Sequence, residues 1–468
     1  MNAPLIWILL PGSSAILLYL LRRWKTIIHL AGSLICVVFS FLAWRLPIDE
    51  VISLNIWGGF PAFRVGSTFT VLGRQFVLAN ADRPMLMVIY FAAAFWFSGA
   101  SIAKTSRQFV PLGLAIAALL TATLAVKPFL YAALFIEMVI MLCVPLLAPP
   151  GASAGRGVIR FLTLMSLGAP FILFSGWQFS GIEANPENNL FVLRALISLG
   201  LGFALLLAIF PFQTWVPMLA EEANPFIAGF VFFALPSTTG LFLLNFLSQY
   251  VWLRQSQVVQ TALVFMGCWM VFISGAWALF QTHAGRILGY AVLMEIGNSI
   301  LMIGLYSNVV PSSQLLGLYF VQLAARCLAL ALWAQALAMM KNSQGSLHFS
   351  SLGGIGRSYP IASAALLIAH FTTAGLPLLA NFPHFYTLWT TLSSFSTTAT
   401  LVALAGQAGL LLAGLRTTAA FLSPSSKYSI GWKISERRQE IVWLGCVASA
   451  LVLIGLLPKW FLFPLGGL

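Results

Sequence analysis

The chain has 468 residues, of which 60% are hydrophobic and only 7% are charged. Soluble domains contain about 25% charged residues, so this composition excludes an ordinary soluble protein and predicts a polytopic membrane protein. The net charge of +13 is spread over short loops, which argues against nucleic acid as a partner. The sequence has no haem, iron–sulfur, zinc or phosphate-loop motif, so we expect no cofactor and no bound metal ion.

The hydrophobic pattern predicts an all-α fold of about fourteen membrane-spanning helices, each built from about 20 apolar residues. The first predicted span is too long for the apolar part of a signal peptide, and its positive charges follow it. In chain order the predicted spans are 4–21, 26–44, 84–102, 109–126, 128–148, 158–177, 190–211, 225–247, 258–281, 287–306, 312–340, 359–382, 390–415 and 440–465.

Prolines interrupt two of these predicted helices at positions five helices apart. Pro211 and Pro217 lie in the aromatic stretch FPFQTWVPMLAEEANPF, at the end of the seventh span, and Pro377 and Pro383 interrupt the twelfth. Broken helices at matching positions in two halves are typical of transporters built from inverted repeats. We therefore predict that helices 4–8 and 9–13 are two copies of one five-helix unit.

This repeat predicts four parts: N-terminal helices 1–3 in 1–108, the two repeats in 109–247 and 258–415, and a loop with a last helix in 416–468. The loops predicted on one side, including the elbow at 211–224, carry about twice as many Lys and Arg residues as the others. That excess predicts a cytoplasmic elbow, with both termini on the opposite side of a bacterial inner or plasma membrane.

Ionisable residues inside membrane helices are costly and are candidates for function. Glu137, in the fifth span, is either a proton-binding residue or a neutral Glu hydrogen-bonded into a helix contact. Glu295 and Arg326, on consecutive helices, are expected to face each other, as a static brace or as part of a charge relay. His370 and His384 flank the second break and either titrate near neutral pH or fill structural positions.

Five sequence stretches, in order, resemble the antiporter-like membrane subunits of respiratory complex I, Mrp sodium/proton antiporters and membrane-bound hydrogenases. The elbow is similar to the family's Phe-Pro-Phe-His-Thr-Trp-Leu-Pro motif, with Gln213 at the His, and LYAALFIEMVIM is similar to the fifth-helix motif that contains Glu137. AGRILGYAVLMEIGN and YFVQLAARCLALAL resemble the tenth and eleventh helices, with Arg326 at a family Lys. LGGIGRSYPIASAALLIAHFTTAGLPLLANF resembles the linker and the broken twelfth helix. The resemblance covers residues 70 to 420.

The resemblance implies a proton-translocating subunit of a complex I-like NADH/quinone oxidoreductase or a related complex, without redox centres of its own. Its partners would be other membrane subunits and the lipid bilayer, and it would move protons or sodium ions. Three positions where the family has ionisable residues are apolar here: Leu206, Leu235 and Phe385. A non-conducting scaffold subunit, an Mrp-type cation/proton antiporter subunit and a free-standing transporter therefore remain as alternatives.

Overall fold

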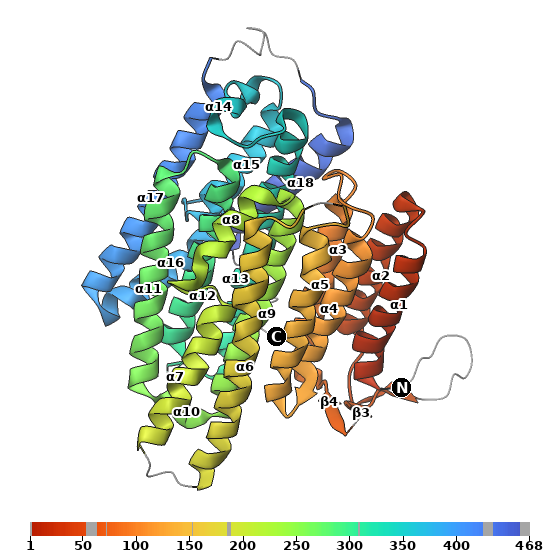
Figure 1. The fold of residues 1–468 in the computed structure, drawn as a ribbon, viewed down its shortest axis with the longest axis vertical. Coiled ribbons are helices and arrows are strands. Elements are labelled where there is room, and N and C mark those ends of the chain that lie inside the picture. The colour runs from red at the N-terminus through yellow and green to blue at the C-terminus, as the bar shows by residue number, and fades with distance from the viewer. Residues whose placement is uncertain are drawn as a thin grey trace. The chain divides into compact units, whose positions relative to one another are not determined.

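A computed structural model describes residues 2–52, 63–71, 73–151, 153–184, 189–307, 309–424 and 434–458. The chain forms two compact units. Unit 1 comprises residues 1–101, 106–150 and 162–205, and unit 2 comprises residues 102–105, 151–161 and 206–468. Figure 1 labels the α-helices of both units and the strands β3 and β4.

Unit 1 is a helical bundle in which α2 packs on α3, and α4 packs on both α1 and α5. The side chain of Trp7 donates from Nε1 to the carbonyl of Phe39 in α2 at 3.2 Å, and Tyr90 of α3 donates to the carbonyl of Trp7. Helix α6 begins in unit 2 and continues into unit 1. The helices are η1 (Leu5–Leu9), α1 (Leu10–Leu20), α2 (Lys25–Arg45), η2 (Asn80–Asp82), α3 (Arg83–Gly99), α4 (Phe109–Ala125), η3 (Phe129–Tyr131), α5 (Ala132–Leu147), α6 (Arg156–Ala184) and α7 (Asn189–Leu206).

Five short strands depart from the all-α prediction. Two of them form an antiparallel pair, and the other three form an antiparallel sheet in the order β3-β4-β5. The β3–β4 hairpin lies in the long connection 45–83. This connection has no apolar run long enough to indicate a membrane span, so no element was predicted there. The strands are β1 (Val51–Ile52), β2 (Phe63–Arg64), β3 (Thr68–Val71), β4 (Arg74–Val77) and β5 (Val126–Lys127).

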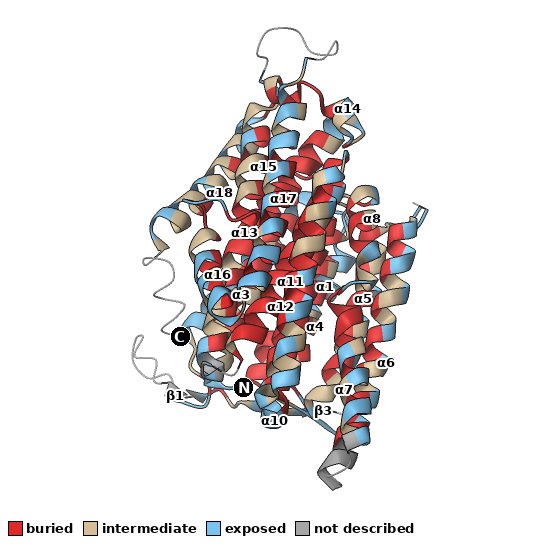
Figure 2. Ribbon diagram, turned by 90° about the vertical axis from the view of Figure 1, so that its left-hand side faces the viewer, coloured by how far each residue is buried: buried red, intermediate tan, exposed pale blue. Residues whose placement is uncertain are grey.

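Unit 2 is built around α12, which packs against α11 on one side and α8 on another. Helix α11 also contacts α17, and α13 contacts α9 and α15. The ribbon of α12 is largely buried in Figure 2, since 94% of its most apolar window is inside the protein. The helices are η4 (Phe212–Thr214), α8 (Trp215–Glu222), α9 (Pro225–Gln249), α10 (Val251–Gln255), α11 (Gln257–Phe280), α12 (Ala284–Tyr306), α13 (Ser312–Gln344), α14 (Phe349–Leu352), η5 (Ile355–Arg357), α15 (Pro360–Thr373), α16 (Phe382–Phe395), α17 (Thr397–Leu422) and α18 (Arg438–Leu456).

The protein is an integral membrane protein, as the composition predicts. Within the described residues, nine helices are long and apolar enough to cross a membrane, or ten if the bent pair of Phe349–Arg357 with Pro360–Thr373 is one span. Every predicted span overlaps a helix, whereas the count of fourteen crossings exceeds what length and hydropathy alone support. Residues 459–465 of the last predicted span lie outside the described residues.

Both predicted helix breaks are present, but two of the four prolines have a different role. Pro211 lies in the first break (residues 207–211) and Pro377 lies in the second (residues 374–381). Pro217 and Pro383 instead occupy the first turns of the helices that follow, α8 and α16. A first-turn proline is tolerated because its missing N–H would have no partner within the helix.

The ends of the broken helices also differ from the prediction. The seventh helix ends at Leu206 and not at 211, and the thirteenth begins at Thr397 and not at 390. Ser396 causes the second difference, because its backbone is extended and its Oγ accepts the Ala399 N–H at 3.3 Å as a helix cap. Residues 390–395 therefore belong to the separate helix α16.

Each break contains a non-glycine residue in the left-handed region of backbone conformation. Ala208 has φ of 50° in the first break, and Leu378 has φ of 73° in the second. Such conformations cost about 1–3 kcal/mol each and persist where the surrounding structure fixes them, often at functional sites. The two breaks therefore share a backbone feature as well as their prolines.

Candidate functional site

Glu295 lies in the middle of α12 and is completely buried. Asn381, the last residue of the second break, donates from Nδ2 to Glu295 Oε1 at 2.8 Å. The second carboxyl oxygen, Oε2, is buried without a hydrogen-bond partner among the described residues. The helix break thus places a polar side chain against a buried acid. Irregular backbone at this depth is tolerated only where it is buried in protein or lines a cavity.

Arg326 of α13 is also buried, at 1% exposed, and interacts electrostatically with Glu295. This interaction agrees with the expectation that the two residues face each other, although no N–O contact within 4.0 Å joins them in the described part of the chain. Arg326 Nε and Nη2 lack hydrogen-bond partners there, as do both amide atoms of Gln322, one turn earlier on the same helix. We call Glu295, Gln322, Arg326 and Asn381 the Glu295 cluster.

His370 of α15 is held on two sides. Its ring stacks on Trp333 of α13, with centroids 4.4 Å apart and planes 25° apart, and its Nε2 lies 2.9 Å from the Leu410 carbonyl of α17. A carbonyl only accepts, so Nε2 carries the proton and Nδ1 carries a lone pair. That Nδ1 is buried without a partner among the residues described.

His384, in the first turn of α16, is 8% exposed, and its Nε2 is another buried atom without a described partner. The described residues show no hydrogen bond from either histidine to Glu295. The structure therefore brings Glu295, Arg326 and Asn381 together, and it leaves His370 and His384 as separate buried polar groups of unit 2.

Glu137 of α5 has simpler surroundings in unit 1. Ser166 of α6 donates from Oγ to Glu137 Oε1 at 2.6 Å, and Oε2 is buried without a partner in the described residues. A serine linking neighbouring helices agrees with the interpretation of Glu137 as a hydrogen-bonded helix contact. The unpaired oxygen agrees equally with a proton-binding group, so both interpretations of Glu137 stay open.

The three positions where the resemblance implies ionisable residues are apolar and buried in this chain. Leu206, Leu235 and Phe385 are all buried, with at most 1% of any of them exposed. An aliphatic or phenyl side chain cannot bind a proton, so a proton path through these positions would need other groups or water.

The elbow segment is fixed to the helix that carries Glu295. A Cβ atom at Gly289 of α12 would come 2.8 Å from Pro217 Cα, and one at Gly285 would come 2.4 Å from the Ala220 carbonyl oxygen. These glycines let α8 approach α12 more closely than any larger residue would allow. Any movement of α8 in the elbow would therefore also displace α12.

A second polar group, missed in the sequence, lies where α8 ends and α12 and α14 begin. Glu221, His283 and His348 each place one ligand-type atom within 4.8 Å of the others. Burial lowers the pKa of His283 to about 4, so its ring is neutral at physiological pH. The three residues come from distant segments, so no short spacing motif could reveal them.

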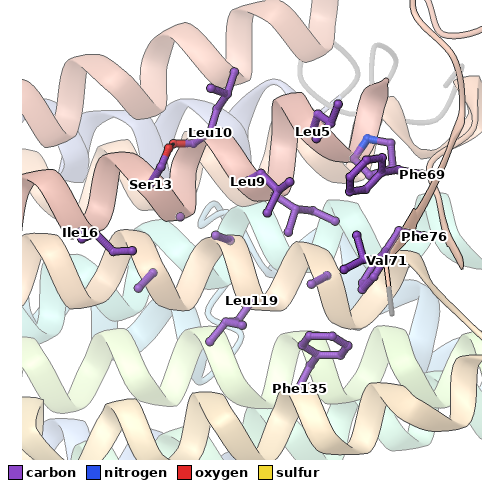
Figure 3. Close-up of a pocket in the computed structure, with 16 residues that line it drawn as sticks. Leu5, Leu9, Leu10, Ser13, Ile16, Phe69, Val71, Phe76, Leu119 and Phe135 are labelled. Carbon is purple, nitrogen blue, oxygen red and sulfur yellow. The ribbon is translucent and has the colours of Figure 1, made fainter. Parts of the chain in front are cut away.

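Unit 1 also contains an apolar cavity of about 810 Å³, shown in Figure 3. Residues of η1, α1, α4, α5 and the β3–β4 hairpin line it, including Leu9, Phe76, Leu119 and Phe135. No titratable side chain lines the cavity, so it adds nothing to a chain of proton-binding groups.

The sequence is similar to proteins of respiratory and antiporter complexes. The family model described as NADH:quinone oxidoreductase/Mrp antiporter, TM, matches residues 160–411. NADH-quinone oxidoreductase subunit N of Orientia tsutsugamushi is 25% identical over 211 residues, which are 44% of this chain and 43% of the relative. The chain spans about half the length of the curated relatives that it matches.

The fold is shared over the whole chain. A chain of the membrane-bound sulfane sulfur reductase, an archaeal respiratory membrane complex, superposes with a TM-score of 0.80 at 17% identity, covering 100% of this chain and 96% of that one. A chain of the Mrp complex from Dietzia sp. DQ12-45-1b gives a TM-score of 0.79 at 15% identity, covering 99% and 96%. At these identities the similarity shows the fold alone.

Proposed function

The chain belongs to the NADH:quinone oxidoreductase/Mrp antiporter transmembrane family, and on this basis we propose that it is an antiporter-like, ion-translocating subunit of a complex I-like or related membrane complex. Its partners are other membrane subunits, and its ion is the proton. The observation that carries the proposal is the Glu295 cluster, a buried acid beside a buried cation and a helix break.

Buried ionisable groups are retained in membrane helices mainly where they serve an ion path. The Glu295 cluster combines a group that can bind a proton with a fixed positive charge and several polar atoms that lack protein partners. Buried polar atoms are normally hydrogen-bonded, so these atoms are suited to contact water along a path. Protonation of Glu295 would then respond to any movement of Arg326 or Asn381.

The two breaks support two inverted repeats of five helices each. The first repeat comprises α4, α5, α6, the pair α7 and α8, and α9. The second repeat comprises α11, α12, α13, the pair α15 and α16, and α17. In both, the fourth helix is the broken one, with a proline in the break and one non-glycine residue at positive φ. Fourteen crossings follow from this arrangement if three helices precede the repeats and α18 follows them.

The distribution of Lys and Arg supports a cytoplasmic elbow, with both termini on the opposite side of a bacterial inner membrane. Asn381, at the end of the second break, lies beside the buried Glu295 of α12. The chain would conduct the proton and leave electron transfer to its partner subunits.

The test is proton translocation per electron in the assembled complex. Glu295→Gln keeps the shape and the hydrogen bond from Asn381 but cannot release a proton, so we expect translocation through this chain to fall at least tenfold. Glu440→Gln is the matched control, because this carboxylate caps α18 by accepting the Arg437 N–H and lies outside the Glu295 cluster. Unchanged translocation in Glu295→Gln, with normal assembly, would refute the proposal.

A non-conducting scaffold is the second candidate, favoured by the buried apolar residues Leu206, Leu235 and Phe385. It predicts that Glu137→Gln and Glu295→Gln are both silent while deletion of the chain prevents assembly of the complex. Purification of the tagged chain in mild detergent, followed by mass spectrometry, identifies the partners. Mrp-type partners together with sodium-dependent activity would instead favour the cation/proton antiporter alternative.

A further inference from the structure

Glu221, His283 and His348 have the chemistry of a transition-metal site. Two imidazoles and one carboxylate are the ligand types that Zn²⁺ takes in proteins, often with water as a fourth ligand. From this juxtaposition we infer that unit 2 binds one divalent ion of the zinc class where α8 ends and α12 and α14 begin. This inference does not depend on the proposed function.

The backbone holds the two histidines side by side. The N–H of Ala284 donates to the Leu347 carbonyl at 2.9 Å, and the N–H of Phe349 donates to the Thr282 carbonyl at 2.9 Å. His283 and His348 thereby form an antiparallel pair without hydrogen bonds between themselves, the kind of pair whose side chains approach most closely. Their ring centroids are 4.8 Å apart, with planes 82° apart.

The third ligand comes from the last turn of α8. Helix α8 is fixed on α12 at Gly285 and Gly289, and Lys341 donates from Nζ to the carbonyls of Glu222 and Ala223 at 3.1 and 2.8 Å. The position of Glu221 relative to His283 is therefore set by packing of the backbone and does not depend on the carboxylate.

The distances leave a small adjustment for side chains. Ligand atoms around a tetrahedral Zn²⁺ are about 3.4 Å apart, given bond lengths near 2.1 Å, and the three ligand atoms here lie within 4.8 Å of one another. His348 is exposed, and 27% of the Glu221 side chain is exposed, so both can rotate toward the buried His283. The ion would thus be bound at the edge of the protein with access from water.

Two cations compete with a metal ion for this position. Arg286 donates to Glu221 Oε2 at 2.6 Å and forms an ion pair with it, and Lys341 lies near the same carboxylate. The Arg286 side chain is 44% exposed and can leave Glu221 for water. Metal binding would therefore break the Arg286–Glu221 ion pair. In its place, one ion would bind Glu221, His283 and His348 and so link three chain segments.

The experiment is a titration of the full chain, purified in detergent and freed of metal by a chelator. Zn²⁺ binding is measured by calorimetry, and Co²⁺ binding by the visible absorption of the ion in a tetrahedral site. We expect one ion per chain, with the affinity at least tenfold lower in His348→Ala and in Glu221→Gln. Arg286→Gln should bind Zn²⁺ more tightly, because the competitor for Glu221 is removed.

Ser350→Ala is the matched control, since Ser350 is an exposed neighbour on α14 that offers no ligand to the cluster. It should bind like the wild type. His348→Ala changes an exposed side chain, so it tests the site even if Glu221→Gln alters the packing of α8. The site is disproved if Zn²⁺ does not bind saturably, or if His348→Ala and Glu221→Gln bind it as tightly as the control.

Discussion

Glu137 in unit 1 and Glu295 in unit 2 are both carboxyl groups on membrane helices, but they have different neighbours. Glu137 accepts a hydrogen bond from the serine of an adjacent helix, and it is only half-buried. Glu295 is completely buried, accepts from an asparagine in a helix break, and has a buried arginine nearby. The residue type is the same, but Glu295 has both a cation and an amide nearby that can change its proton affinity, whereas Glu137 has one serine.

This difference suggests that the two carboxyl groups have different roles. A single hydrogen bond can hold a carboxyl group in place but gives little means of changing its proton affinity. A cation and an amide carried on separate helices can change it when either helix moves. We therefore expect substitutions near Glu295 to affect both stability and translocation, and those near Glu137 to affect mainly stability.

The largest effect is expected from Arg326→Met, which removes the cation and leaves the Glu295 carboxyl group without it. Loss of one member of a buried charged pair costs about 3–5 kcal/mol, so we expect the free energy of unfolding to fall by about 3 kcal/mol. Denaturant unfolding in detergent measures the change. The double variant Glu295→Gln/Arg326→Met should recover part of the loss, and additive effects within about 0.5 kcal/mol would show that the two groups are not coupled.

A smaller effect is expected from Ser166→Ala in unit 1. The substitution removes one 2.6 Å hydrogen bond to Glu137, and a hydrogen bond of this kind contributes about 1–2 kcal/mol. The free energy of unfolding should fall by that amount, while translocation per electron stays near the wild-type value. A tenfold loss of translocation would break the contrast between the two acids, because Glu137 would then need its serine partner to conduct.

The composition was sufficient to predict a helical membrane protein, and the proline pattern was sufficient to place both helix breaks. Hydrophobic runs report burial along a helix, and prolines report where backbone hydrogen bonds are missing. The pairing of β4 with β5 was not predicted because it joins residues far apart in the sequence, and the β3–β4 hairpin was not predicted because its strands are only four residues long. Pro217 and Pro383 were misassigned because a proline in a first turn and one in a break look alike in sequence.

The candidate site was predictable in its charges and not in its contacts. Glu295 and Arg326 stand out as ionisable residues in apolar helices, yet Asn381 gives no signal, since asparagine is common in loops. The cluster of Glu221, His283 and His348 is formed by an antiparallel contact and by close packing at two glycines. Neither feature has a fixed spacing, so neither could be predicted from a single sequence.

The smallest effect is expected at Glu436, which lies outside the membrane helices and supports the start of α15, the helix before the second break. Glu436 Oε1 accepts the Ala362 N–H at 2.7 Å. Burial raises the pKa of this carboxyl group, although the N–H groups of Ala362 and Ile361 act in the opposite direction. The folded state therefore binds the proton more tightly than the unfolded chain does.

A raised pKa of an acid favours the folded state at low pH, and this contribution is lost as the pH rises through the pKa of the folded protein. Glu436→Gln cannot lose a proton, so its stability should lack this decrease. Unfolding measured between pH 4 and pH 8 should show the variant gaining on the wild type as the pH rises. If the wild type gains instead, the ionised carboxylate is the better partner for the N–H groups at the start of α15, and burial does not dominate the proton affinity of Glu436.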